Sequence, residues 1–401
     1  MRSTWLLLSS LLLPTLSSAA TWVFSEPVLV TAERNDRIFH HLESAGRRNI
    51  AVSGETVAVS WEDDRDGTPR IYIARKKIAD ADFSSELQIS GEGEAFEPSI
   101  VGLSGERFLL AWEENEQVFA RIIGPKSSGP VIRLSSKAGS QPSLSKYSDG
   151  AVIVWSERDG RFGHIRMAKL GFDNKQQLTN INSCAVDTAA AEDEQLYPAA
   201  AEAAGEIVVA WEDRRLGHTV IMAARGKPCK LSIPVRISDK LEQRSVTYGK
   251  GHGVSRVTLA AHGKSGMLAV WADKRDFREG YDIFAADSQG GEGFTTNMRV
   301  QDDFGGVARQ WHPTSAGHRD GSLLVAWTDE REGHSDIMMS AYTNGEWDED
   351  TPLTGAAGPA EQGHPSITLD GAGRLHIAWV ERDDRNSPTR LKYMIGNMLA
   401  D

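Results

Sequence analysis

The sequence predicts an all-β protein, a seven-bladed β-propeller whose blades are four-stranded antiparallel sheets. Two observations predict this fold and a third supports it. An apolar run that ends in tryptophan occurs seven times, at Trp61, Trp112, Trp155, Trp211, Trp271, Trp327 and Trp379. Successive copies lie 43 to 60 residues apart, a spacing typical of propeller blades. No long stretch of the chain has the periodicity of an amphipathic helix.

Each repeat predicts four strands in a fixed order. A first strand begins 13 or 14 residues before the tryptophan, usually at a proline, as in residues 97–100 and 364–367. Proline is tolerated there because the first residue of a strand need not donate to the ladder. The second strand is the β-branched run into the tryptophan, such as residues 57–61. Third and fourth strands follow, for example at residues 220–222 and 234–237.

The last repeat contains only three strands before the chain ends. Residues 26–30 resemble the fourth-strand pattern of residues 233–237. We therefore expect the N-terminal strand to complete the last blade, which closes the ring and leaves no exposed sheet edge. Residues 21–401 then form one domain.

Residues 1–20 have the pattern of a secretory signal peptide. Arg2 precedes an apolar run that is too short to span a bilayer, and small residues follow at 18–20. No later run is long enough for a membrane span, so we expect a secreted or periplasmic monomer. The net charge of −12 argues against nucleic acid as a partner, because that interaction needs a basic face. Cys184 and Cys229 form either one disulfide or two separate thiols.

An acid and an arginine follow several of the tryptophans at fixed spacing. The acids are Asp63, Asp213, Asp273 and Asp329, and the arginines are Arg65, Arg215, Arg275 and Arg331. These pairs could form a charged ring that binds carboxylates or sugar hydroxyls. The favoured interpretation is structural, because a feature copied in most blades is expected to stabilise its own turn.

The propeller topology places these turns on one face, together with the starts of the first strands and the longest insertions. Those insertions are residues 31–48, 181–196, 239–255, 302–311 and 355–363. Long loops on a rigid scaffold commonly carry binding sites, so we expect the ligand on this face, at the central channel. Residues that differ between blades are the best candidates there. They are Arg256, His252, His312 and His364 for ligand binding, and Tyr248 with Glu242 for catalysis.

Several of these histidines could converge to hold a metal or to act as acid and base. No His-x-x-x-His spacing supports a metal, so solvated loop histidines are the favoured interpretation. We therefore expect neither a metal nor a cofactor.

The repeats resemble the sialidase-like, or BNR-repeat, propeller superfamily of secreted bacterial proteins. The Asp-box of that superfamily, Ser-x-Asp-x-Gly-x-Thr-Trp, has only degenerate counterparts at residues 340–347 and 287–291. The resemblance implies three arginines around a substrate carboxylate, a tyrosine paired with a glutamate, and an aspartate acid/base. Tyr248 and Glu242 are the matching pair, while the Arg-Ile-Pro motif is reduced to residues 37–39.

Three functions are consistent with these patterns. The first, which we favour, is binding of a glycan or another extracytoplasmic ligand on the loop face. The second is an exo-sialidase-like glycoside hydrolase with carboxylates on different blades. The third is a scaffold for protein interactions in the cell envelope.

Overall fold

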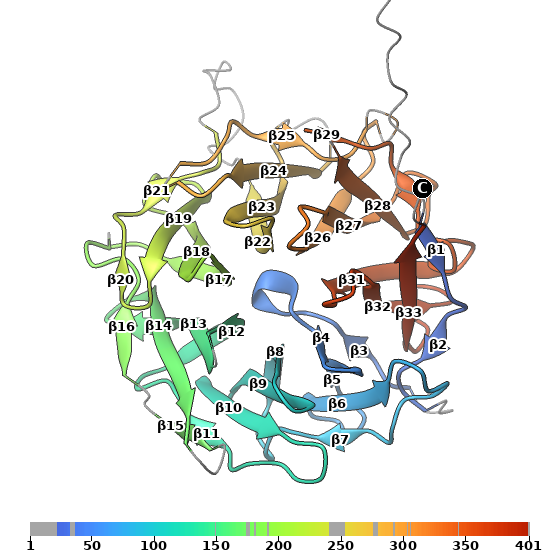
Figure 1. The fold of residues 1–401 in the computed structure, drawn as a ribbon, viewed down its shortest axis with the longest axis horizontal. Coiled ribbons are helices and arrows are strands. Elements are labelled where there is room, and N and C mark those ends of the chain that lie inside the picture. Colours follow the sequence, from blue (N-terminus) through green and yellow to red (C-terminus); the bar gives the residue numbers. More distant parts are fainter. Residues whose placement is uncertain are drawn as a thin grey trace, which may run out of the picture.

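The computed structural model is a ring of seven antiparallel sheets (Figure 1). This confirms the predicted all-β, seven-bladed propeller. We call the central region that the inner strands surround the channel. The structure describes residues 22–32, 37–148, 150–173, 177–179, 182–190, 192–239, 253–275, 280–291, 293–302, 304, 306–343 and 345–399. No helix within these ranges has the length and apolar character needed to cross a membrane.

We number the blades one to seven along the chain, starting with the sheet that contains Trp61. The innermost strands are β3 (His40–His41) with β4 (Ile50–Ser53), β8 (Ala95–Leu103), β12 (Gly139–Tyr147), β17 (Gln195–Ala203), β22 (Val254–His262), β26 (Gln310–Gly317) and β31 (Glu361–Leu369). The second strands are β5 (Thr56–Asp63), β9 (Arg107–Glu114), β13 (Gly150–Asp159), β18 (Glu206–Asp213), β23 (Gly266–Asp273), β27 (Leu323–Asp329) and β32 (Leu375–Arg382).

The third and outermost strands complete each blade. The third strands are β6 (Arg70–Lys77), β10 (Gln117–Ile123), β14 (Phe162–Phe172), β19 (Val220–Lys227), β24 (Asp282–Ser288), β28 (Asp336–Thr343) and β33 (Arg390–Met398). The outermost are β7 (Leu87–Gln88), β11 (Ile132–Arg133), β15 (Leu178–Thr179), β16 (Ser183–Ala185), β20 (Lys230–Leu231), β21 (Val235–Arg236), β25 (Met298–Arg299), β29 (Glu346–Trp347) and β30 (Thr351–Pro352).

The N-terminal segment closes the ring, as the sequence predicts. Strands β1 (Trp22–Phe24) and β2 (Val28–Leu29) both pair with β33 in blade seven. Val28 lies opposite Tyr393, inside the range of the predicted strand. Both ends of the described chain therefore belong to one sheet, and the ring has no gap (Figure 1).

The seven repeated tryptophans form the core between neighbouring sheets. Every one of them is fully buried. Trp155 of blade three, for example, packs in one cluster with Leu109 and Ala111 of blade two. Burying an aromatic side chain between blades is strongly favourable, because it removes a large apolar surface from water. The prediction that these tryptophans are core residues is confirmed.

Cys184 and Cys229 are joined by a disulfide, with their Cα atoms 5.8 Å apart. Cys184 lies on β16 at the outer edge of blade three, and Cys229 precedes β20 of blade four. The bond therefore ties the rims of two adjacent blades, which settles the alternative that the sequence left open.

Blade one differs from the others at its inner strand. In blade two, β8 runs without interruption, and Phe96 pairs with Glu113. In blade one, the strand divides into β3 and β4, and the segment between them, residues 42–49, enters the channel (Figure 1). We call residues 42–49 the channel segment. Its short 3₁₀ turn, η1 (Ala45–Arg47), contacts inner strands β8, β12, β17, β22 and β26.

Candidate functional site

The turns after the tryptophans are stabilised from within their own blade. In blade six, Trp327 donates its indole N–H to Asp329 at 3.0 Å, and Arg331 Nε donates to the other carboxylate oxygen at 3.0 Å. The same contacts recur in blades one and four, and blade five keeps the indole bond and an Arg–Asp contact. Each acid thus satisfies a buried indole donor and a cation at once.

The four repeated arginines are each engaged in local ion pairs. Arg215 contacts Asp187 at 2.5 Å besides Asp213, and Arg331 contacts Asp350 at 2.6 Å besides Asp329. Arg65 pairs with Asp63 and Glu86, and Arg275 with Asp273. These local contacts support the structural interpretation of the repeated Asp/Arg pairs. A ligand-binding role for the four arginines stays a prediction.

A different ring of residues lies at the start of the inner strands. In every blade one non-glycine residue there has a positive φ, between 48° and 58°. These residues are Arg47, Glu97, Gln141, Tyr197, Arg256, His312 and His364. In blades two to seven this residue lies near the start of the inner strand and coincides with a shift in strand register, whereas Arg47 of blade one belongs to η1 in the channel segment. We call these seven residues the mouth ring. Non-glycine residues in this region of backbone space are uncommon, and here they recur with the irregularity in the inner strands.

The channel segment is anchored across the mouth ring. Arg48 donates to the carbonyl oxygens of Ala200 at 3.0 Å and Leu259 at 3.2 Å, which lie on β17 and β22. Ser366 of blade seven donates to the carbonyl oxygen of Arg47 at 3.0 Å. Gly46 has a φ of 68°, and a Cβ there would lie 2.8 Å from Ser143 Oγ of blade three. Glycine therefore permits both this turn and its close approach to the channel wall.

Glu43, on the channel segment, lies among mouth-ring residues from several blades. Its Oε1 is 2.6 Å from His364 Nδ1, and its Oε2 lies 3.5 Å from Arg47 and 3.8 Å from Arg256. Burial alone would raise the pKa of Glu43, but Arg47 and the adjacent His364 hold that pKa well below its ordinary value. Glu43 is therefore a carboxylate at neutral pH.

Arg256 connects opposite sides of the channel. Its Nη1 lies 2.9 Å from Glu97 Oε1, and its guanidinium carbon lies 3.9 Å from the centre of the Tyr197 ring. Burial would lower the pKa of Arg256, but Glu97 and Glu43 raise it above the ordinary value. Arg256 therefore remains charged while its side chain is 24 % exposed.

His312 and His364 stack on each other, with ring centres 4.1 Å apart. Trp311 stacks on His312 with a centre separation of 4.6 Å. Burial, reinforced by His364 and Arg47, holds the pKa of His312 well below its ordinary value, so its imidazole is neutral. A cavity of about 130 Å³ is lined by both histidines, Trp311 and His41.

A second set of carboxyl groups lies behind the mouth ring. The residue after the tryptophan accepts the backbone N–H of the next blade's ring residue in several blades. Glu212, for example, accepts from Arg256 at 2.8 Å, and Glu113 accepts from Gln141 at 3.3 Å. Burial raises the pKa of Glu212 to about 7 and that of Glu113 to about 7. Burial, followed by repulsion from Glu97 and Glu43, raises the pKa of Glu62 to about 8.

The mouth ring brings together three of the predicted ligand-binding residues, namely Arg256, His312 and His364. Tyr248, Glu242 and His252 lie outside the described residues, so their predicted roles stay predictions. Sequence reasoning missed Glu43, Arg47, Glu97 and Tyr197 as site residues. The signal for two of them was present, because Glu97 and Tyr197 precede the prolines that mark first strands. Glu43 gives no such signal, because it belongs to an insertion.

Comparison with known proteins identifies the fold and not a family. No model of a protein family matches the chain, and no curated protein matches it. Among solved structures, it is similar to a polysaccharide lyase of family PL25, an ulvan lyase bound to a glucuronate–sulfated rhamnose unit. The identity is 10 %, the TM-score is 0.59, and the match covers 91 % of this chain and 95 % of the other.

The chain is also similar to the GH93 α-L-arabinofuranosidase of Fusarium graminearum in complex with arabinobiose. The identity is 11 %, the TM-score is 0.51, and the match covers 75 % of this chain and 92 % of that enzyme. Both likenesses confirm the fold. Neither protein is a sialidase, and the resemblance to BNR-repeat proteins stays a prediction.

Proposed function

We propose that the mouth ring and Glu43 form the binding site for a glycan. The observation that carries this proposal is the convergence of acid, arginine, histidine and tyrosine side chains from different blades at the channel mouth. Carboxylates accept hydrogen bonds from sugar hydroxyls, and guanidinium and imidazole groups donate to ring and hydroxyl oxygens. The similar solved structures, an arabinofuranosidase and an ulvan lyase, act on glycans and support the same class of ligand.

The charges at the site favour a neutral glycan. Arg47 and Arg256 are already paired with the carboxylates of Glu43 and Glu97. An anionic sugar would have to compete with these acids for the two cations. Sialic acid, which the sequence resemblance implies, is therefore a less favoured ligand than a neutral oligosaccharide.

Hydrolysis of a glycosidic bond is the second candidate function. Such enzymes use two carboxyl groups, one ionised and one protonated. Glu43 is held ionised, whereas Glu62 has a pKa of about 8 and therefore carries its proton at neutral pH. This difference in protonation supports Glu62 as a general acid and Glu43 as its ionised partner. Tyr248 and Glu242 remain the pair implied by the sialidase resemblance.

A glycan array tests the binding proposal. We expect the protein to bind neutral oligosaccharides and the Arg256→Ala variant to lose that signal. Arg374→Ala is the matched control, because Arg374 forms an equivalent pair with Asp370, at 2.6 Å, in the hairpin between β31 and β32. Absence of any glycan signal, together with specific recovery of one protein partner, would replace this proposal by the scaffold function.

Release of reducing sugar from the bound oligosaccharide tests the second candidate. Glu62→Gln and Glu43→Gln should retain binding within about tenfold but lose product formation. Each keeps the shape of the side chain, but the first removes the proton that the general acid donates and the second removes the negative charge of its partner. Product formation that persists in both variants would exclude the assigned pair.

The cellular location and oligomeric state are part of the same proposal. We propose a monomer outside the cytoplasm, on the basis of the N-terminal leader pattern and the Cys184–Cys229 disulfide, which is stable in oxidising compartments. N-terminal sequencing of the mature protein should begin near residue 21, and light scattering should give the mass of a single chain. A mature protein that retains residue 1 would contradict the assigned location.

A further inference from the structure

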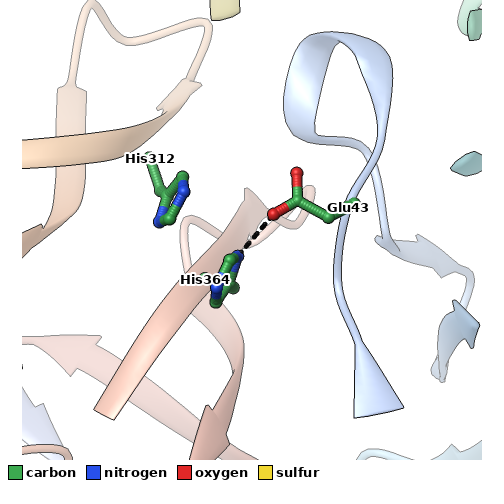
Figure 2. Close-up of side chains that lie close together, drawn as sticks. All are labelled: Glu43, His312 and His364. Carbon is green, nitrogen blue, oxygen red and sulfur yellow. Dashed lines mark ion pairs between the residues drawn. The ribbon is translucent and has the colours of Figure 1, made fainter. Parts of the chain in front are cut away.

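Three groups that commonly bind metals lie together at the channel mouth. Glu43, His312 and His364 each offer one ligand atom, and these atoms all lie within 4.8 Å of one another. Figure 2 shows the three side chains approaching from different parts of the chain, with the Glu43 carboxylate directed at His364. His312 lies on inner strand β26 and His364 lies on inner strand β31, whereas Glu43 belongs to the channel segment.

The bonding of His312 is a second, independent observation. Its Nδ1 atom is inaccessible to water and has no hydrogen-bond partner among the described residues. A buried polar atom without a partner costs free energy, so such atoms usually have a functional explanation. A neutral imidazole nitrogen with a free lone pair is the form in which histidine binds metals.

We propose that Glu43, His312 and His364 bind a divalent transition metal ion, with Zn²⁺ the best match to this set of ligands. Two imidazole nitrogens and one carboxylate oxygen are typical of zinc sites that keep a fourth position open. Ca²⁺ and Mg²⁺ prefer oxygen ligands alone and do not fit two histidines. The open position would face the cavity beside His312 and His364.

The geometry requires only a small rearrangement of side chains. Ligand atoms of a tetrahedral zinc site lie roughly 3.3 Å apart, given bonds of about 2.0 Å. The pair joining Glu43 and His364, at 2.6 Å, must open slightly, and the widest pair, within 4.8 Å, must close by at most about 1.5 Å. The stacked imidazoles must also tilt apart, which rotation about their side-chain torsions allows.

The surroundings hold the carboxylate in place for such an ion. The second oxygen of Glu43 lies near Arg47 and Arg256, at 3.5 and 3.8 Å, and these contacts keep the carboxylate oriented. Trp311 packs against His312 and restricts its ring. Neighbouring groups of this kind tune the affinity of metal sites. The proposed metal site does not depend on a glycan, so it and the proposed function can fail separately.

Isothermal titration of tag-free, EDTA-treated full-length protein with ZnCl₂ at pH 7.5 tests the inference. We expect one equivalent to bind, with an affinity that falls at least about tenfold in His312→Ala and His364→Ala. His334→Ala is the matched control, because His334 also pairs with a carboxylate, Asp336, at 3.2 Å, but belongs to no group of three possible metal ligands among the described residues. Its affinity should equal that of the unaltered protein.

Two further measurements keep the test decisive if a variant folds poorly. Co²⁺ bound to the unaltered protein should give the visible absorption of a four-coordinate site with nitrogen ligands, and Glu43→Gln should change that spectrum. Zn²⁺ should raise the melting temperature of the unaltered protein and of His334→Ala. Sub-stoichiometric binding, or equal binding after both His312 and His364 are replaced, would overturn the inference. Adventitious binding of Zn²⁺ at the surface would then be the explanation.

Discussion

Arg256 of blade five donates to Glu97 of blade two across the propeller channel, with 2.9 Å between Nη1 and Oε1. Residues of these two blades are far apart in the sequence, and the ring brings them together. Glu97 is largely buried, and burial raises its pKa although Arg256 opposes the shift. Loss of the arginine would leave this acid without its cation.

Arg256→Ala should therefore destabilise the protein, by about 2–4 kcal/mol, because it leaves a buried carboxyl group unpaired. Urea denaturation at pH 7 measures the change. The double variant Arg256→Ala/Glu97→Gln should recover part of the loss, since it removes the unpaired acid as well. Equal stability of the single and double variants would show that the pair has no coupling energy.

The turn after Trp327 provides a second prediction. Asp329→Ala should lower the free energy of unfolding by about 2–3 kcal/mol, because it leaves the buried Trp327 indole N–H without an acceptor and removes a partner of Arg331. Asp329→Asn retains an acceptor and should cost less. Glu332→Ala, at an exposed position of the same turn, is the control and should change stability by less than about 0.5 kcal/mol. A similar loss in all three variants would contradict the role of Asp329.

The disulfide between blades three and four provides a third prediction. Cys184→Ser/Cys229→Ser should lower stability by about 2–4 kcal/mol, since the bond closes a loop with a sequence separation of 45. Differential scanning calorimetry of the oxidised protein and the variant measures the difference. Two titratable thiols in the untreated protein would contradict the bond.

The raised pKa of Glu212 predicts how stability depends on pH. Its folded pKa of about 7 lies above the ordinary 4.5, so the folded state retains a proton that the unfolded chain releases. The contribution of Glu212 to the free energy of unfolding is fully present below about pH 4.5. It is lost as the pH rises through 7. Glu62 and Glu113, also raised, act in the same direction.

We expect Glu212→Gln to flatten the fall in unfolding free energy between pH 5 and 8, measured by urea titrations at each pH. The substitution can keep the acceptor for the Arg256 N–H while removing the titrating group. Glu332→Gln, at an exposed position, is the control and should leave the slope unchanged. An unaltered slope in Glu212→Gln would show that Glu212 does not titrate in this range.

The channel segment provides a fifth prediction. Gly46→Ala places a Cβ 2.8 Å from Ser143 Oγ and 3.2 Å from Ala199 Cβ, so the segment must shift and move Glu43. Gly333→Ala is the matched control, because Gly333 also has a positive φ but an added Cβ there meets nothing within 4 Å. We expect both variants to lose about 1 kcal/mol from backbone strain, and only Gly46→Ala to weaken glycan binding. Equal binding in both would show that the segment does not position Glu43.

The sequence by itself determined the blade count, the closure by residues 26–30 and the burial of the tryptophans. These features follow from local patterns, because each blade repeats the same short-range order of apolar run, Trp and turn. It also favoured the structural interpretation of Asp329 and Arg331, since a contact within one turn depends on residues two positions apart.

The tertiary structure decided the composition of the site. Glu43, Arg256 and His312 are far apart in the sequence and meet only because the closed ring directs the inner strands at one channel. The split of blade one into β3 and β4 places Glu43 there, and no periodic pattern marks an insertion of this kind. Local order therefore determines the scaffold, whereas chemistry at the channel depends on distances that only ring closure fixes.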